Sequence, residues 1–116
     1  MSTTVTIIYP DEPTLVVPNE ILAKLQGMNL APSFGFTSPV TAPSVEILSS
    51  PEEGICEWGE GMDEPVESRF IIKITDALRY DAQQGFHRSD IDQTLPIWKE
   101  LEALIGCPLK QASYKV

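Results

Sequence analysis

The alternation of hydrophobic and polar positions along the chain predicts strands in five segments. Residues 3–9 are largely β-branched and place Val5, Ile7 and Tyr9 on one face, which is the period of two expected of a strand. The strongest alternation lies in residues 66–74, where the apolar Ile71 on the polar face predicts a central strand covered on both sides. The shorter predicted strands are 14–17, as the return of an N-terminal hairpin, 44–48, and 110–116 at a sheet edge.

Three other segments have apolar positions at helical spacing, namely residues 20–26, 76–84 and 95–105. Each is preceded by a residue type that commonly caps a helix and is followed by a glycine that can end one. The expected N-caps are Asn19, Thr75 and Thr94, and the expected terminating glycines are Gly27, Gly85 and Gly106.

The length of 116 residues suits one domain, and no internal repeat divides the chain. We therefore expect residues 1–116 to form a single small α+β domain. The element order predicts a largely antiparallel sheet of about five strands with two to three helices on one face. No signal peptide is visible, and no apolar run approaches the roughly 20 residues that span a bilayer. We expect a soluble, cytoplasmic protein.

The charge distribution is strongly uneven. The chain has a net charge of −9. Residues 1–68 carry eleven acids and one base, a net charge of −10, whereas residues 69–116 carry six acids and seven bases, a net charge of +1. An acidic field repels nucleic-acid phosphates and anionic membranes. The composition thus favours a basic protein partner or a cation over direct binding of nucleic acid or membranes.

The acidic segment 51–67 is the strongest candidate site. Three interpretations of this segment are open: it docks on a basic protein surface, it binds a hard cation, or it is a solvated hairpin loop. The D-x-D-x-D-G order of a calcium loop is absent, so we expect no metal. Trp58 within the segment is either an interface anchor with a charged rim or a core residue. The acidic candidates for partner binding are Glu52, Glu53, Glu57, Glu60, Asp63, Glu64 and Glu67.

The proline-containing segment 28–43 has no period, and Phe34 and Phe36 lie near its centre. Long loops of this kind often carry function. The two rings are either a secondary apolar contact with a partner or are packed into the edge of the core. Exposed aromatic pairs reduce solubility, which favours the second interpretation.

Evidence for catalysis is weak. His87 is the only histidine, and Asp90 and Asp92 follow it closely, so acid–base chemistry at this point is an alternative hypothesis. Cys56 and Cys107 lie far apart without metal-ligand spacing, and reduced, unreactive thiols are favoured over a disulfide. No glycine-rich phosphate loop is present, and we expect no cofactor.

These features together predict a small acidic inhibitor or immunity-type protein that is not an enzyme. It would occlude a basic surface on a partner such as a nuclease or another nucleic-acid-handling protein, acting as a nucleic-acid mimic. The alternative is a structural subunit of a larger complex, with self-association also open. A small enzyme using His87 is the third hypothesis.

Overall fold

The computed structural model describes most of the chain as an α+β fold, as the sequence predicts. Its elements are β1 (Thr4–Pro10), α1 (Asn19–Gly27), α2 (Leu30–Ser33), β2 (Ser44–Ser49), β3 (Cys56–Trp58), β4 (Val66–Ser68), β5 (Phe70–Thr75), β6 (Arg79–Asp81), β7 (Phe86–Arg88), α3 (Pro96–Ile105) and β8 (Leu109–Lys115). The described residues are 4–35, 44–50, 54, 56–58, 66–75, 79–81, 86–88 and 90–115, with the backbone alone for residues 56, 57, 79–81, 86–88 and 115.

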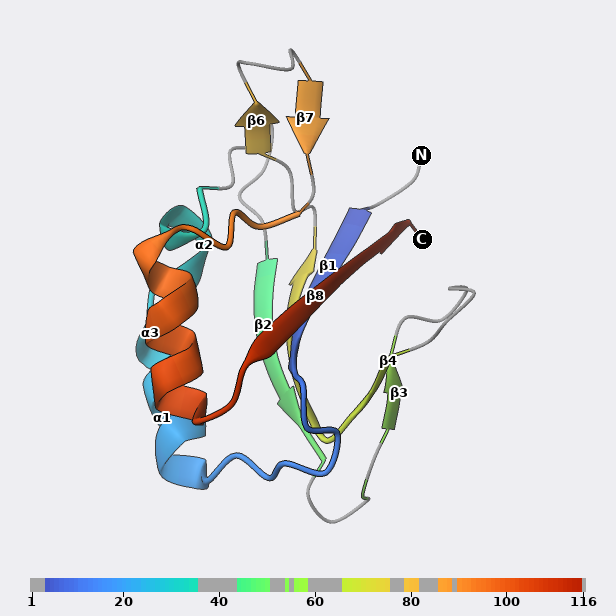
Figure 1. The fold of residues 1–116 in the computed structure, drawn as a ribbon, viewed down its shortest axis with the longest axis vertical. Coiled ribbons are helices and arrows are strands. Elements are labelled where there is room, and N and C mark those ends of the chain that lie inside the picture. The colour runs from blue at the N-terminus through green and yellow to red at the C-terminus, as the bar shows by residue number, and fades with distance from the viewer. Residues whose placement is uncertain are drawn as a thin grey trace.

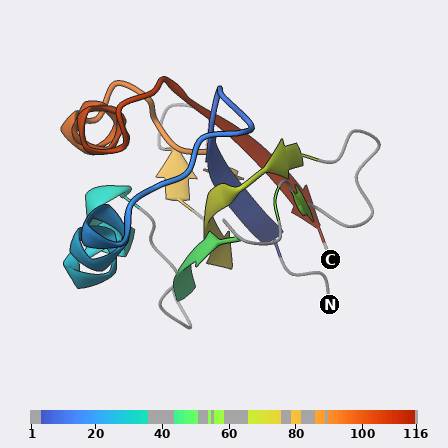
Figure 2. The ribbon, with the colours of Figure 1, turned by 90° about the horizontal axis from the view of Figure 1, so that it is seen from below.

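The main sheet has four antiparallel strands in the order β2-β5-β1-β8 (Figure 1). β5 is central and β8 lies at an edge, so both of these predictions are confirmed. The strands β3 and β4 form a separate pair, as do β6 and β7. The helices lie on one side of the main sheet and the β3–β4 pair lies on the other (Figures 1 and 2).

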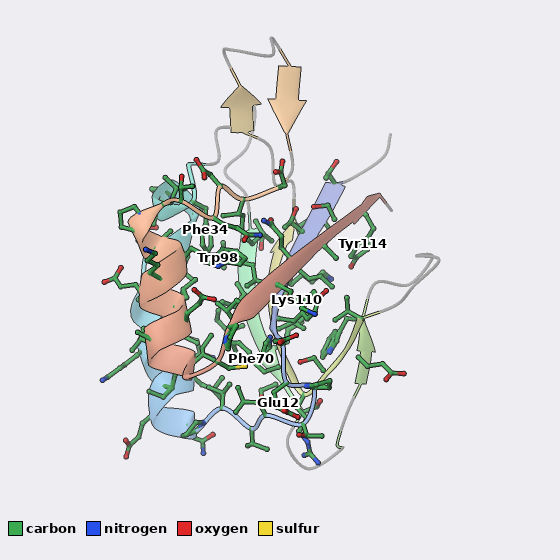
Figure 3. The ribbon with its side chains drawn as sticks, viewed as in Figure 1. Glu12, Phe34, Phe70, Trp98, Lys110 and Tyr114 are labelled. Atoms are coloured by element: carbon green, nitrogen blue, oxygen red, sulfur yellow. The ribbon has the colours of Figure 1, made fainter. Side chains whose placement is uncertain are left out.

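The two faces of the main sheet bury two separate hydrophobic clusters, because both faces are covered. The larger cluster fills the space between sheet and helices, with Phe34 and Trp98 towards one end and Phe70 towards the other (Figure 3). The smaller cluster lies on the other face, with Val5, Ile7, Val66 and Ile71 at its centre. Partly buried side chains surround this second cluster, namely Tyr9, Leu48, Trp58, Ala112 and Tyr114.

The predicted N-terminal hairpin is wrong. Residues 15–18 form no strand, and β1 instead lies between β5 and β8. Because both edges of β1 are already paired, no position remains for a return strand. A turn follows β1 instead, in which the N–H of Leu15 donates to the carbonyl of Glu12 at 3.1 Å.

The predicted helix over residues 76–84 is also wrong. Residues 79–81 form β6, and residues 86–88, which include the Phe86 expected after the helix end, form β7. Residues 76–78 and 82–85, which include Gly85, lie outside the described residues. The apolar stripe of this segment consisted of Leu78 and Ala82, which is too little buried surface to hold a short helix against a competing hairpin.

The ends of the helices differ in detail from the predicted caps. α1 begins at Asn19 itself, and the carbonyl of Pro18 accepts the N–H groups of Ile21 and Leu22. α3 begins at Pro96, one residue later than expected for a helix with Thr94 as its N-cap. Gly27 is the last residue of α1. Gly106 has the expected role, because it ends α3 with a left-handed φ of 81°.

Candidate protein-binding surface

The acidic segment leads into a small hairpin whose position depends on a break after Ser68. The predicted strand 66–74 is divided there into β4 and β5. The buried Ser68 hydroxyl donates to the carbonyl of Phe70 at 2.8 Å and also accepts the N–H of Phe70 at 3.3 Å. These local hydrogen bonds replace regular strand pairing, so β4 leaves the main sheet and pairs with β3.

Arg69 occupies the break and connects three segments through its backbone. Its N–H donates to the carbonyl of Pro13 at 3.1 Å, and its carbonyl accepts the N–H of Ser50 at 2.8 Å. The Ser50 hydroxyl donates to the carbonyl of Gly54 at 3.1 Å. The base of the acidic segment is therefore tied both to the end of β2 and to the turn after β1.

The inner face of the β3–β4 hairpin packs on the second hydrophobic cluster. Val66 is 7% exposed and Ser68 is fully buried. Trp58, which is paired with Val66, is partly buried against the same cluster, and its indole N–H donates to the carbonyl of Ser68 at 2.9 Å. Of the two interpretations of Trp58, the structure favours the packing role. The indole fixes the hairpin to the sheet, and its residual exposed surface alone is accessible to a partner.

The outer face of the same hairpin carries two acidic residues in register. Glu57 is the direct cross-strand partner of Glu67, and Glu67 is exposed. Residues directly opposite each other in an antiparallel pair lie on one face with Cβ atoms roughly 5 Å apart, and like charges in such positions are destabilising. Glu57 and Glu67 therefore occupy opposite register positions on one face of the hairpin backbone, and Glu67 places a negative charge at the surface.

The remaining predicted acidic residues cannot be added to this surface. Residues 51–53 and 59–65 lie outside the described residues. They include Glu52, Glu53, Glu60, Asp63 and Glu64. The surface defined by the structure consists of the β3–β4 outer face, and we call it the acidic hairpin face, meaning Glu57 and Glu67.

Phe34 is not available to a partner. It is fully buried in the larger cluster, and its N–H donates to the carbonyl of Leu30 at 3.0 Å. The prediction of Phe34 as a secondary apolar contact is therefore corrected in favour of the core alternative. The reason is that α2, which the sequence pattern did not reveal, turns the ring inward between helices and sheet. Phe36 lies outside the described residues.

The residues of the catalytic hypothesis lie on different local structures. His87 is in β7, where it pairs with Tyr80. Asp92 follows that hairpin and accepts the N–H and hydroxyl of Thr94 at 2.9 and 2.6 Å, so this carboxylate shapes the turn before α3. Cys107 is a free thiol packed at the edge of the larger cluster.

Sequence reasoning did not identify the positioning residues Ser68 and Gln111. The amide of Gln111 holds the segment before α3, and Ser68 produces the break that orients the acidic hairpin face. The available signal for Ser68 was a small polar residue on the face of the strand that otherwise carries Val66, Phe70, Ile72 and Ile74. Gln111 carries no comparable signal, since a glutamine in an edge strand is ordinary.

Two further properties limit the chemistry of the described residues. They contain no group of three or more His, Cys, Asp or Glu side chains arranged to hold a metal ion. None of the described helices combines the length and apolar character needed to cross a membrane.

Relationships to known proteins do not extend this description. Comparison of the chain with protein-family models, with curated proteins and with solved structures found no match. The functional inference therefore rests on the acidic hairpin face and its support.

Proposed function

We propose that this protein binds a basic surface of another protein through the acidic hairpin face and the flanking acidic segment 51–67. A partner that handles nucleic acid, such as a nuclease, has the required chemistry, because its lysines and arginines are arranged to meet phosphates. Occupying those side chains with carboxylates would inhibit the partner by competition. The protein would then act as an inhibitor or immunity-type protein without catalysis of its own.

The observation that carries the proposal is the register of Glu57 against Glu67 on a hairpin whose other face is buried. The packing of Val66 and Trp58 holds the backbone of the two acidic positions in place before any partner arrives. Two carboxylates on a backbone that is already held in place lose less conformational entropy on binding than two carboxylates on a flexible segment. They also suit an arginine, which binds carboxylates through two parallel hydrogen bonds.

The test is capture of partners from a lysate of the natural setting by wild-type protein and by Glu57→Gln/Glu67→Gln, at low and at moderate salt. The matched control is Glu20→Gln/Glu100→Gln, which removes two charges from exposed helical positions elsewhere. We expect wild-type protein to capture a basic partner, and we expect this capture to weaken as salt rises. The hairpin variant should lose the partner or bind it with roughly 5- to 30-fold lower affinity, which corresponds to about 1–2 kcal/mol. Equal capture by wild type and the hairpin variant would remove the acidic hairpin face as the site.

The structural-subunit alternative predicts the opposite salt response. Its apolar contact would have included Phe34, which is buried, and the largest exposed hydrophobic side chain among the described residues is Val16, at 48%. Capture that resists salt and is unchanged in Glu57→Gln/Glu67→Gln would favour assembly through the edges of the main sheet.

A further inference from the structure

The two edge strands of the main sheet, β2 and β8, differ in their protection against pairing with another chain (Figure 1). β8 carries a lysine near each end, and the side-chain amide of Gln111 binds the backbone of Ile91 alongside it. Lysines and covering segments are two ways in which proteins protect a strand edge. β2 contains no lysine or proline, and its one charged residue is Glu46. The edge at β2 is therefore the less protected one.

The outer edge of β2 presents the backbone N–H and C=O groups of Val45, Ile47 and Ser49. In an antiparallel pair, alternate residues bond to the neighbouring strand and those between them point away from it. The N–H of Ser50 donates to the carbonyl of Arg69 at 2.8 Å, in line with the register of β2 and β5. The even-numbered residues of β2 therefore bond to β5, and the odd-numbered residues face the open edge.

This edge is incomplete within one chain. Among the described residues, β5 alone pairs with β2, and none forms a hydrogen bond with the outward groups of Val45, Ile47 or Ser49. The side chains of Val45 and Ile47 are partly buried against the larger cluster, and that of Leu48 is partly buried against the second cluster. An added strand would satisfy the backbone groups and extend the apolar cover on both faces of the sheet.

The outward groups of β2 match a second copy of the same strand. The next positions in the same alternation, 43 and 51, are both prolines, which have no N–H, and Ile47 lies midway between them in the sequence. An antiparallel pairing centred on Ile47 sets this residue opposite the second copy's Ile47, and sets Val45 opposite the second copy's Ser49. In that register every outward N–H of one β2 strand faces an outward C=O of the other.

We infer that the protein forms a two-fold dimer in which the β2 strands of two copies pair antiparallel with Ile47 at the centre. The side chains favour the same register, because Glu46 lies opposite the second copy's Leu48 and not opposite another carboxylate. Moving the axis to Glu46 would oppose the two Glu46 side chains and would leave Ser49 opposite a proline. Moving the axis to Leu48 would leave Val45 opposite a proline.

This dimer is closed. Pairing of the two β2 strands gives one continuous sheet with β8 at both ends, and β8 is the protected edge strand. A two-fold contact uses the same surface of both copies, so no further copy can be added at β2. The edge therefore specifies a dimer and not an open fibre.

The net charge of the protein determines the salt response of the dimer. Each copy has a charge of −9, so two copies repel each other at long range. Salt screens this repulsion, since the Debye length falls from roughly 10 Å at 0.1 M to roughly 3 Å at 1 M. The backbone hydrogen bonds and apolar contacts across β2 do not depend on this screening. Association of two copies should therefore tighten as salt rises.

The inference goes beyond the proposed function and can fail independently of it. It involves neither Glu57 nor Glu67, and its salt response has the opposite sign to that of a basic partner. Loss of the dimer would leave capture of a basic partner unexplained by β2 and still open to its own test. Loss of that capture would leave the pairing of β2 unchanged.

The experiment is analytical ultracentrifugation of the full chain at about 0.1 M and about 1 M salt. The chain concentration runs from about 10 μM to about 1 mM, the range in which small interfaces associate. We expect the mean mass to rise from 12.8 kDa toward twice that value, and to do so at lower chain concentration in the higher salt. A chain that stays monomeric at about 1 mM in both salts would overturn the inference.

The test variant is Ile47→Pro, which removes the central outward N–H without removing a hydrogen bond between β2 and β5. The matched control is Ile47→Val, which has as many side-chain carbons as proline and keeps the N–H. We expect the dissociation constant to rise by about 10-fold or more in Ile47→Pro and by less than about 3-fold in Ile47→Val. Circular dichroism verifies that both variants fold. A folded Ile47→Pro variant with wild-type affinity would overturn the inference by placing the interface elsewhere.

Amide hydrogen exchange of the wild-type chain tests the register without any substitution. Raising the concentration from about 50 μM to about 1 mM should slow exchange at Val45, Ile47 and Ser49. Exchange at Ser113, whose N–H faces the outer edge of β8, should not change. Exchange at Ile47 that is independent of concentration would overturn the inference. Slowing at Ile47 that requires an added basic protein would also overturn it, by assigning the edge to a strand of that protein.

Discussion

The side chain of Gln111 pairs with both backbone polar groups of Ile91. Its amide oxygen accepts the Ile91 N–H at 2.6 Å, and its amide nitrogen donates to the Ile91 carbonyl at 2.8 Å. Ile91 is 1% exposed and belongs to the larger cluster. The Gln111 side chain on β8 thus satisfies the backbone hydrogen-bonding groups of Ile91, which lies outside any strand. It holds the segment before α3 against the sheet.

Replacing Gln111→Glu should destabilise the fold by about 1–3 kcal/mol, because a carboxylate oxygen would then face the Ile91 carbonyl without a proton to donate. Urea denaturation measures the loss. The matched control is Gln93→Glu, the same chemical change at an exposed position, which should alter the free energy of unfolding by no more than about 0.5 kcal/mol. Similar values for the two variants would show that the Gln111 contact contributes nothing specific.

Two glycines should respond to alanine in opposite directions. Gly27 is helical, and a Cβ there would meet no atom within 4 Å, so Gly27→Ala should raise the free energy of unfolding by about 0.4–1 kcal/mol. Gly106 also has open space, but its φ of 81° disfavours any side chain. Gly106→Ala should therefore lower the free energy of unfolding by about 1 kcal/mol or more. Chemical denaturation of the two variants compares them directly, and changes of the same sign would contradict the assigned backbone conformations.

The indole N–H of Trp58 should matter for the hairpin more than for the whole fold. Trp58→Phe removes the donor to the Ser68 carbonyl while keeping an aromatic ring on the second cluster. We expect amide hydrogen exchange to accelerate in β4 with little change in β5, for a local loss of about 0.5–1.5 kcal/mol.

Trp98→Phe provides the contrast, because Trp98 is 3% exposed in the larger cluster and its truncation should lower global stability. If Trp58→Phe instead accelerated exchange equally in β4 and β5, the hairpin would not be a separately opening unit. Trp58→Phe leaves the charge of the protein unchanged. Its affinity for the partner therefore measures how much preorganisation of the hairpin contributes to binding.

Tyr114 should ionise late in an alkaline titration. Burial raises the pKa of its phenol above the ordinary value of 10.0, because the charged phenolate is disfavoured there. Because its pKa is raised in the folded state, the protonated Tyr114 phenol contributes to the free energy of unfolding. This contribution is complete below pH 10.0 and is lost as pH rises through the higher folded pKa. Tyrosinate absorbance follows the titration, and Tyr114→Phe should remove the late step. A late step that survives the substitution would assign it to another tyrosine.

The elements that sequence patterns predicted correctly share one property. In β1, α1, β2, β5, α3 and β8 the spacing of apolar residues matches the period of the element that forms. The segment 76–84 failed because two apolar positions at helical spacing could not outweigh pairing of residues 79–81 with 86–88. The return strand at 14–17 failed because pairing of β1 with β5 and β8 is decided by distant residues.

The candidate site was predictable in composition but not in geometry. The acidic run and Trp58 were visible in the sequence, whereas the burial of Phe34 depends on α2, a helix of four residues with no periodic signal. The opposition of Glu57 and Glu67 depends on the register of the β3–β4 pair. Both features arise from contacts between segments, and a single sequence does not display them.

The position of β1 between β5 and β8 has a consequence for the order in which the protein is made and folds. β1 is among the first described residues to be synthesised, yet its pairing with β8 must wait for the last ones, at Leu109–Lys115. Until then one side of β1 is an open strand edge able to pair with other chains. The sheet is completed across nearly the whole chain, a long-range closure that slows folding. Nascent chains of this protein should therefore depend on chaperones more than its small size suggests.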